Sequence, residues 1–216
     1  MRSSFKLYIA LASLVAFILW SALLLIVDVH PIGPNGSSVG FAALNGGFHR
    51  LTGVHMGLYT VTDWLGLVPI AFVLGFAVLG FVQLVKRKSL AAVDRNIIFL
   101  GIFYVAVGVV FLLFEKLEVN YRPVLINGVL EASYPSSTTL LSLCVIPTAV
   151  MQLGGRIKKT WLRRTVSVLL WGFTVFMVIG RVISGVHWLT DIIGGLLVSV
   201  ALVSTYSFFA EDKISE

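Results

Sequence analysis

Long apolar stretches separated by short polar segments make up most of this 216-residue chain. A helix needs about 20 apolar residues to cross the hydrocarbon core of a bilayer. Six stretches meet this requirement, and we expect a transmembrane helix over each of residues 7–27, 62–85, 96–114, 136–153, 165–183 and 189–209. The pattern predicts an all-α, polytopic membrane protein, a six-transmembrane-helix bundle that forms one domain over residues 1–216.

The composition agrees with this pattern. Hydrophobic residues make up 58% of the chain and charged residues only 12%. Soluble domains average about 45–50% apolar and about 25% charged residues. A soluble core of this size has too few charged residues to cover so much apolar surface, so membrane lipid is the expected surrounding.

Basic residues divide unevenly between the two sides that six crossings define. Both termini fall on one side, which carries twelve of the sixteen Lys and Arg residues. These are Arg2, Lys6, Lys86, Arg87, Lys88, Arg95, Arg156, Lys158, Lys159, Arg163, Arg164 and Lys213. Because cytoplasmic loops carry an excess of basic residues, we predict a multi-pass protein of the cell membrane with cytoplasmic termini. The net charge of +6 therefore reflects topology, and no nucleic-acid partner is expected.

The segment 28–61 joins the first two predicted spans and becomes amphipathic in its second half. Residues 42–59 are predicted to lie in the membrane interface as a short helix. One side of it carries Phe41, Leu44, Phe48 and Leu51. Contact of His49 or His55 with a lipid headgroup is one interpretation, but solvated or interfacial histidines are favoured because no metal-ligand spacing accompanies them.

Ionisable residues gather at the outer ends of the predicted helices. Lys116 and Arg122 follow the third span, Arg181 ends the fifth, and His187 and Asp191 open the sixth. Ionisable residues near membrane depth are costly and mark functional sites. We therefore expect these residues to form one site at the outer face. Asp63, near the outer end of the second span, is expected only to orient Trp64 at the interface.

The fourth span opens with a run of hydroxyl side chains after Pro135, at Ser136, Ser137, Thr138 and Thr139. The first amide groups of a helix are unpaired, and the helix dipole adds positive potential, so this end attracts anions. Taken alone, the run is better explained as a helix cap. With Arg122 and Arg181 nearby, a phosphate-binding site becomes the better explanation.

His187 and Asp191 are four residues apart, which places them on one face of a helix. A carboxylate beside an imidazole fixes the tautomer and holds the ring for nucleophilic attack. Taken alone, such a pair is more often structural than catalytic. Ser184 and Gly185 are expected to break the helix, which lets Arg181 and His187 turn toward the same site.

Three motifs together resemble the type 2 phosphatidic acid phosphatase (PAP2) family, whose motifs are Lys-x6-Arg-Pro, Pro-Ser-Gly-His and Ser-Arg-x5-His-x3-Asp. The third motif is the specific one, and the spacing of Arg181, His187 and Asp191 matches it completely, with Gly180 in place of the leading serine. The second motif appears as Pro135-Ser136-Ser137-Thr138. The first appears as Lys116-Leu117-Glu118-Val119-Asn120-Tyr121-Arg122-Pro123, one residue short, with Glu115 at the lysine position. Motif order and helix layout extend the resemblance over most of the chain.

The resemblance implies a role for each matching residue. His187 would attack phosphorus and form a phospho-histidine, and Asp191 would orient it. Arg122 and Arg181 would bind the phosphoryl oxygens and stabilise charge in the transition state. Ser136 and the amide of Ser137 would add hydrogen bonds. Lys116 would contribute only if local bending offsets the shortened spacing.

Thr138 stands where the family has a histidine that resembles a general acid. A threonine hydroxyl is too weak an acid to protonate a leaving oxygen near neutral pH, and general acid catalysis is typically worth about 10²–10⁴-fold. A phosphate leaving group, with a second pKa of about 6, departs without protonation. The sequence therefore favours a lipid diphosphate of the undecaprenyl type over phosphatidate as substrate.

Two further interpretations stay open beside an active lipid phosphatase. One is a catalytically weak relative that binds or transports a lipid phosphate, which the absence of the acid favours. The other is an unrelated transporter or structural membrane protein. Retention of Arg181, His187 and Asp191 together favours the enzyme, because a binder needs no oriented imidazole. No metal or other cofactor is expected, since the cations of the site are side chains, and the sequence leaves the oligomeric state undetermined.

Overall fold

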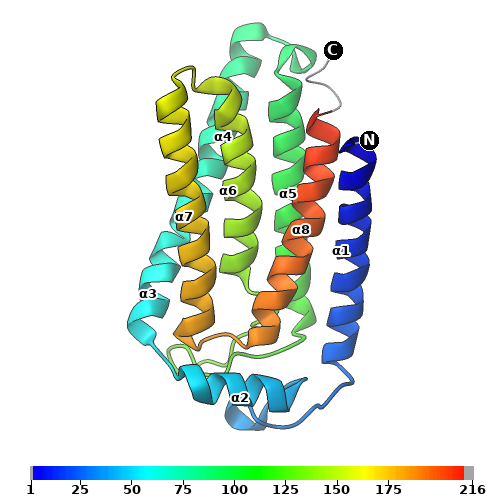
Figure 1. The fold of residues 1–216 in the computed structure, drawn as a ribbon, viewed down its shortest axis with the longest axis vertical. Helices are drawn as coiled ribbons and strands as arrows, with labels where there is room; N and C mark the ends of the chain where they lie inside the picture. The colour runs from blue at the N-terminus through cyan, green and yellow to red at the C-terminus, as the bar shows by residue number, and fades with distance from the viewer. Residues whose placement is uncertain (1, 212–216) are drawn as a thin grey trace.

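A computed structural model describes residues 2–211, and over this range the chain is helical, with isolated β-bridges and no β-sheet. Six helical segments are long and apolar enough to cross a membrane, so the predicted fold is confirmed. They are α1 (Arg2–Leu24), α3 (Met56–Leu65) continuing into α4 (Leu67–Arg87), α5 (Arg95–Leu117), α6 (Ser137–Arg156), α7 (Thr160–Ser184) and α8 (Leu189–Glu211). Figure 1 shows them side by side with both termini at one end. Lys213 of the predicted cytoplasmic set lies outside the described residues.

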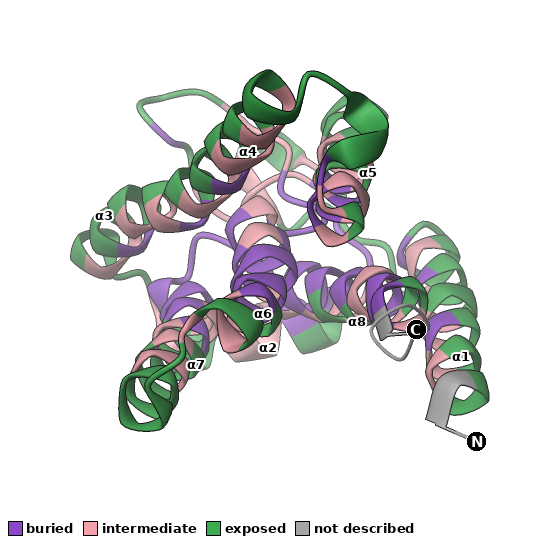
Figure 2. Cartoon of the chain, turned by 90° about the horizontal axis from the view of Figure 1, so that it is seen from above, coloured by how far each residue is buried: buried purple, intermediate pink, exposed green. Residues whose placement is uncertain are grey.

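α6 is the central helix of the bundle. It contacts α4, α5, α7 and α8, and Figure 2 shows that most of its own length is buried. Its buried residues include Ser142 and Thr148, which are small enough to let neighbouring helices approach closely. On α8, a Cβ added to Gly195 would meet the side chain of Thr139 at 3.1 Å. Small residues on both helices thus position the start of α6 against the start of α8.

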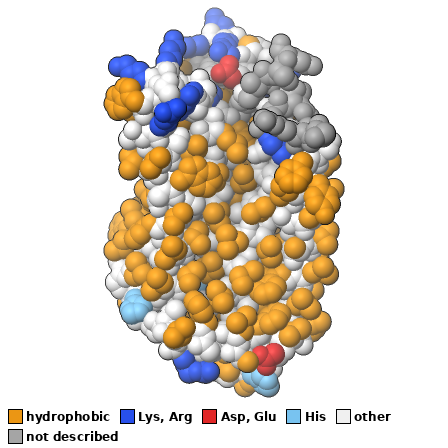
Figure 3. Space-filling view, viewed as in Figure 1, with side chains coloured by type: hydrophobic (Ala, Val, Ile, Leu, Met, Phe, Trp, Pro, Cys, Tyr) orange, Lys and Arg blue, Asp and Glu red, His pale blue; other side chains and the backbone are white. Residues whose placement is uncertain are grey.

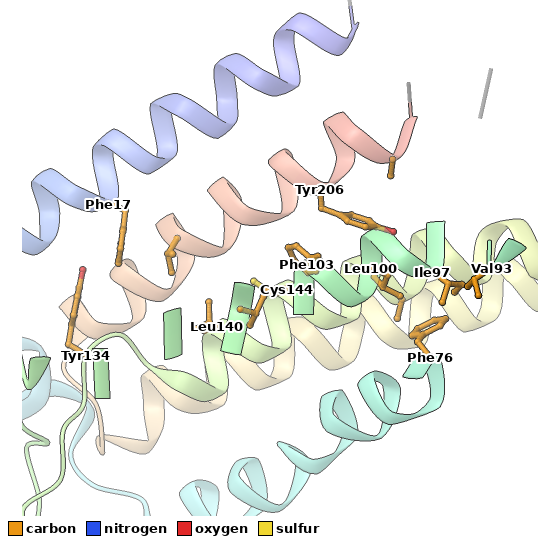
Figure 4. Packing of buried hydrophobic residues seen from close by; sticks show 14 of the residues in the cluster. Phe17, Phe76, Val93, Ile97, Leu100, Phe103, Tyr134, Leu140, Cys144 and Tyr206 are labelled. Carbon is orange, nitrogen blue, oxygen red and sulfur yellow. The ribbon is translucent and has the colours of Figure 1, made fainter. Parts of the chain in front are cut away.

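Aromatic side chains fill the core between α1, α5, α6 and α8 (Figure 4). Phe17 contacts the rings of Phe114 and Tyr134 at centroid distances of 5.3 and 6.2 Å. Phe103 contacts Tyr206 at 5.1 Å. Helices inside a bilayer associate through such packing contacts rather than through the hydrophobic effect, because lipid tails are as apolar as the side chains. The face of the bundle seen in Figure 3 is largely apolar between its two charged ends.

The segment predicted as one interfacial helix over residues 42–59 is two helices, and this prediction was wrong. α2 (Ala42–Thr52) ends at Gly53, whose φ of 69° reverses the chain, and α3 begins at Met56. α2 lies across the end of the bundle, as an interfacial helix should, whereas α3 belongs to the second span (Figure 1). The backbone at this break packs directly against the backbone at Gly185. The approach is so close that a Cβ on Gly185 would meet the carbonyl oxygen of Gly53 at 1.9 Å.

The two ends of the bundle differ in composition. The end with the termini carries the connection between α4 and α5, which contains a short 3₁₀ helix η2 (Leu90–Ala92), and the connection between α6 and α7. Lys and Arg side chains gather there (Figure 3). The opposite end carries α2, a short 3₁₀ helix η1 (Pro34–Gly36), the irregular segment 118–136 and the turn between α7 and α8. The predicted site residues all belong to this second end.

Candidate active site

A polar cavity of about 170 Å³ lies at the end opposite the termini. Its walls come from the end of α5, the segment 118–136, the start of α6 and the turn between α7 and α8. Seven of its lining residues have polar side chains: Glu115, Arg122, Glu131, Ser133, Tyr134, Ser137 and His187. Segments distant in sequence thus meet around one imidazole.

The turn between α7 and α8 places His187 in this cavity. α7 ends at Ser184, and Gly185 follows with a φ of 68°, a conformation that glycine adopts without strain. α8 starts at Leu189. The helix break expected at Ser184 and Gly185 is therefore present. His187, only 5% exposed, enters the site from a short turn fixed by helices on both sides.

The contacts of His187 define its tautomer. Nη1 of Arg122 lies 3.3 Å from Nε2 of His187. Because a guanidinium has only donors, Nε2 must accept this hydrogen bond, and the ring proton belongs on Nδ1. Nδ1 faces Oδ2 of Asp191 at 3.6 Å, slightly beyond hydrogen-bond distance. The imidazole therefore carries its lone pair on Nε2, where Arg122 contacts it, and this neutral tautomer is the form that a nucleophile requires.

Asp191 is fully buried and held from several directions. Its Oδ2 accepts a hydrogen bond from the backbone amide of Trp188 at 2.9 Å. Its Oδ1 accepts one from the Asn120 side chain at 3.3 Å. Its backbone carbonyl accepts one from the amide of Ser136 at 3.2 Å. Asp191 thus ties the turn before α8 to the segment before α6 through its carboxylate, and to the start of α6 through its backbone carbonyl.

Arg122 is fixed by the irregular segment that carries it. Its backbone amide donates to the carbonyl of Glu131 at 3.0 Å, and its Nε forms an ion pair with Oε2 of Glu131 at 3.0 Å. The indole of Trp188 donates to the carbonyl of Tyr121 at 2.7 Å. These contacts hold the guanidinium against His187, although Arg122 belongs to neither a helix nor a sheet.

Arg181, in the last turn of α7, is 1% exposed and pairs with α3. Its Nη2 donates to Oδ1 of Asp63 at 2.9 Å and to Oγ1 of Thr138 at 2.5 Å. The expectation that Asp63 only orients Trp64 was wrong, because a buried guanidinium requires a partner and Asp63 supplies it. The ring of Tyr59 lies 4.9 Å from the Arg181 guanidinium and 5.9 Å from that of Arg122.

The start of α6 brings the hydroxyl run to the site in three different roles. Ser136 is buried at the N-cap without a capping hydrogen bond from its side chain, and its Oγ accepts a bond from Thr139 at 3.0 Å. Ser137 lines the cavity. Thr138 contacts Arg181. The absence of a side-chain cap at Ser136 weighs against the interpretation of this run as a mere helix cap.

Arg122, Ser137 and His187 line the cavity, whereas the buried residues Ser136, Thr138, Arg181 and Asp191 do not. Lys116 does not line it either. It is exposed in the last turn of α5, and the neighbouring Glu115 lines the cavity instead. α5 stays helical through Leu117, so adjacent residues point in directions about 100° apart and no bending restores the lysine. The two histidines of the amphipathic segment bond to backbone carbonyls, His49 to Gly185 at 3.1 Å and His55 to Thr52 at 2.9 Å.

Four polar contributors to the site were missed from the sequence: Tyr59, Asp63, Asn120 and Glu131. Tyr59 and Asp63 are four residues apart, so they share one face of α3. An acidic residue at a membrane boundary was the available signal for Asp63. Asn120 and Glu131 belong to a segment without periodicity, and nothing in the sequence placed them beside the catalytic turn.

The electrostatic surroundings of His187 predict an unusually acidic limit for activity. Burial, reinforced by the charge of Arg122, lowers the pKa of His187 to about 4 from its ordinary 6.5. The neutral nucleophilic form therefore persists down to about pH 4. We expect kcat/KM to fall with an apparent pKa near 4, measured in detergent between pH 3 and 8.

A phosphate and a diphosphate substrate provide the control for this pH profile, since each titrates in its own range. A fall of kcat/KM at the same pH with both substrates is due to a group of the enzyme and not of the substrate. A common limb near pH 6.5 would show that His187 retains an ordinary imidazole pKa in the folded protein.

Comparison with known proteins agrees with this arrangement. The sequence model of the PAP2 superfamily matches residues 103–213, a range that includes all three motifs. The structure is similar to the crystal structure of the first transmembrane PAP2 type phosphatidylglycerolphosphate phosphatase from Bacillus subtilis. The TM-score is 0.62 and the identity 18%, over 95% of this chain and 98% of that chain. At this identity the likeness establishes the fold. Comparison with curated proteins gives no significant match.

Proposed function

This chain belongs to the PAP2 superfamily, and we propose that it is a membrane lipid phosphatase that acts through a phospho-histidine intermediate. Its substrate is a lipid-linked phosphate or diphosphate, with a diphosphate of the undecaprenyl type preferred. The observation that carries the proposal is the buried contact between Nε2 of His187 and Nη1 of Arg122, with Asp191 behind the ring. A nucleophile and an anion-binding group meet at one cavity.

The proposed reaction has two displacements at phosphorus. Nε2 of His187 attacks, a P–N bond forms, and the bond from phosphorus to the leaving oxygen breaks. Water then attacks the phospho-histidine, the P–N bond breaks, and inorganic phosphate leaves with the imidazole restored. Asp191 stabilises the positive charge that develops on the ring in the first step, as the orienting carboxylate does in other nucleophile–base pairs.

Arg122 and Arg181 supply the positive charge that the phosphoryl oxygens need in the transition state. Both guanidinium groups lie near the Tyr59 ring, Arg181 at 4.9 Å and Arg122 at 5.9 Å from its centroid. Nε and Nη1 of Arg181 are buried and have no hydrogen-bond partner in the protein. A phosphoryl oxygen is a suitable acceptor for these donors.

The contact made by Thr138 supports the preference for a diphosphate. Its hydroxyl accepts a hydrogen bond from Arg181, and no ionisable side chain occupies the position of the missing histidine. An alkoxide leaving group, as in phosphatidate, departs poorly without an acid, whereas a phosphate leaving group does not need one.

A panel of detergent-solubilised lipids tests this preference by phosphate release. We expect the wild-type protein to hydrolyse a prenyl diphosphate at least tenfold faster than phosphatidate, within the roughly 10²–10⁴-fold worth of a general acid. The Thr138→His variant is expected to narrow this ratio, because the imidazole donates a proton to the alkoxide. Thr138→Val serves as the control without an acid, and equal wild-type rates on both lipids would contradict the preference.

The proposed topology places the active site at the outer face of the cell membrane and the termini in the cytoplasm. Lys and Arg side chains at the end with the termini support this orientation. The alternative of a lipid phosphate carrier without catalysis predicts binding but no phosphate release. A carrier has no use for a histidine held in one tautomer by Asp191 and Arg122, so hydrolysis is favoured.

A further inference from the structure

Three residues next to Arg181 have no role yet in the proposed mechanism. Two of them differ from the family motifs, and the third is a carboxylate. Thr138 replaces the histidine of the second motif, Gly180 replaces the serine of the third, and Asp63 is four residues after Tyr59 on α3. We propose that Asp63 is a positioning residue for phosphoryl transfer, which holds Arg181 together with Thr138 and so orients the donors that bind the phosphoryl group. This inference rests on the proposed phosphatase function and assigns it a further residue.

The first argument is the distribution of hydrogen bonds over the guanidinium. Asp63 and Thr138 both accept from Nη2 of Arg181, at 2.9 and 2.5 Å. The Tyr59 ring covers the group at 4.9 Å. A planar guanidinium held at one nitrogen, with an aromatic ring over its central carbon, is restricted in orientation. Nε and Nη1 are then the donors left over, and both are buried without a partner.

The second argument is the cost of those two unpartnered donors. Buried N–H groups are nearly always hydrogen-bonded, and unsatisfied ones in a native structure require an explanation. Arg181 is 1% exposed, so bulk water does not satisfy them. A phosphoryl group beside His187 would accept from both. The side of Arg181 bound by Asp63 is therefore the anchored side, and the opposite side is the binding side.

The third argument is the close packing that brings Asp63 to Arg181. A Cβ on Gly180 would meet Cγ2 of Thr62 at 2.7 Å, a distance that real Cβ atoms do not tolerate. The serine of the family motif at this position would require the Thr62 side chain or α3 to shift. Gly180 instead allows the contact, and Asp63 follows Thr62 directly in the chain. Glycine in place of serine at position 180 is therefore consistent with the pairing of Arg181 with Asp63.

Charge explains why the partner is a carboxylate. Arg181 is buried, whereas the side chain of Asp63 is 57% exposed. A buried cation without a counter-ion is strongly unfavourable, and an exposed carboxylate carries little desolvation cost of its own. Asp63 therefore holds the cation in place from the solvent side. Because Asp63 is largely exposed, its removal should affect the position of Arg181 more than the stability of the fold.

The test compares Asp63→Ala, Asp63→Asn and Thr138→Val with the full-length wild-type protein in detergent. We expect Asp63→Ala to lower kcat on a prenyl diphosphate by about 10²-fold, the cost of misplacing a catalytic group by about 1 Å. Inhibition by orthovanadate, a mimic of the transferring phosphoryl group, should weaken in parallel, while KM changes little.

Asp63→Asn keeps an acceptor oxygen without the charge. Its kcat should lie between the kcat of the wild type and that of Asp63→Ala. The double variant Asp63→Ala/Thr138→Val should lose less than the product of the single losses, because both residues hold one nitrogen.

The matched control is Thr60→Ala, which alters an exposed position of α3 that bonds only to its own helix. If Thr60→Ala lowers kcat as much as Asp63→Ala does, the proposal is overturned. It is also overturned if Asp63→Ala has the kcat and the vanadate inhibition of the wild type. A loss of activity explained entirely by a lower thermal unfolding midpoint would also overturn it. If the wild-type protein releases no phosphate from any lipid, the phosphatase function fails separately. The positioning role is then decided by orthovanadate protection against thermal unfolding: protection of wild type but not of Asp63→Ala supports it, and any other result overturns it.

Discussion

Replacement of His187 by alanine is expected to lower kcat by roughly 10⁴ to 10⁶-fold, the range for loss of a member of a nucleophile–base constellation. Without Nε2 no covalent intermediate forms, and the two arginines provide only electrostatic stabilisation for direct attack by water. The measurement is release of inorganic phosphate from a prenyl diphosphate in detergent. Acid quenching during turnover should also trap a labelled phospho-protein in the wild type and none in His187→Ala.

His55→Ala is the matched control for this experiment. His55 lies at the same end of the bundle and is exposed, and its side chain bonds to the carbonyl of Thr52. Its backbone bonds, to the carbonyl of Ser184 and from the amide of Tyr59, remain possible in the alanine variant. We expect its activity to be close to that of the wild type. Retention of more than a tenth of the activity by His187→Ala would remove the phospho-histidine from the mechanism and leave the cavity as a binding site.

Replacement of Arg122 by alanine is expected to lower kcat by about 10³ to 10⁵-fold, the worth of an arginine that stabilises charge in phosphoryl transfer. Arg122 has two roles, since its Nη1 donates to His187 and its charge faces the cavity. Arg122→Lys keeps the charge but loses the planar, forked geometry of the guanidinium. We therefore expect Arg122→Lys to recover only part of the loss, measured as kcat on the same diphosphate.

Arg50→Ala separates the local role of Arg122 from the general positive potential at this end of the molecule. Arg50 is an exposed cation in the last turn of α2 and does not line the catalytic cavity. Its removal should leave kcat almost unchanged. A comparable loss in Arg50→Ala and Arg122→Ala would mean that Arg122 acts only through net charge, and that its contact with His187 contributes nothing to catalysis.

Thr138 and Glu115 give the cavity a charge distribution different from that of the family motifs. Thr138 contacts Arg181 instead of providing an acid, and Glu115 faces the cavity where the family has a lysine. The site therefore has two arginines and four carboxylates: Glu131 pairs with Arg122, Asp63 pairs with Arg181, Asp191 lies beside His187, and Glu115 lines the cavity. A substrate with a good leaving group suits such a site, because the chemistry then depends on charge stabilisation and on the nucleophile.

Several features of the protein follow from the sequence alone. The six spans are predictable because each backbone polar group inside lipid must be satisfied within its own helix, so every span is a continuous apolar stretch. The pairing of His187 with Asp191 is predictable from their short separation, although His187 lies in the turn before α8 and not on the helix face that the spacing predicted. The turn at Ser184 and Gly185 was predictable from glycine for the same local reason.

Tertiary structure decided the remaining features, because they depend on contacts between residues distant in the chain. Asp63 reaches Arg181 across 118 positions, and only the close approach of α3 and α7 at Gly180 makes that pair. The break of the amphipathic segment at Gly53 depends on its packing against Gly185. Whether Glu115 or Lys116 faces the cavity depends on where α5 ends and how it is rotated against α6. Local periodicity contains none of this information, since helix rotation and helix contact are set by side-chain packing across the whole bundle.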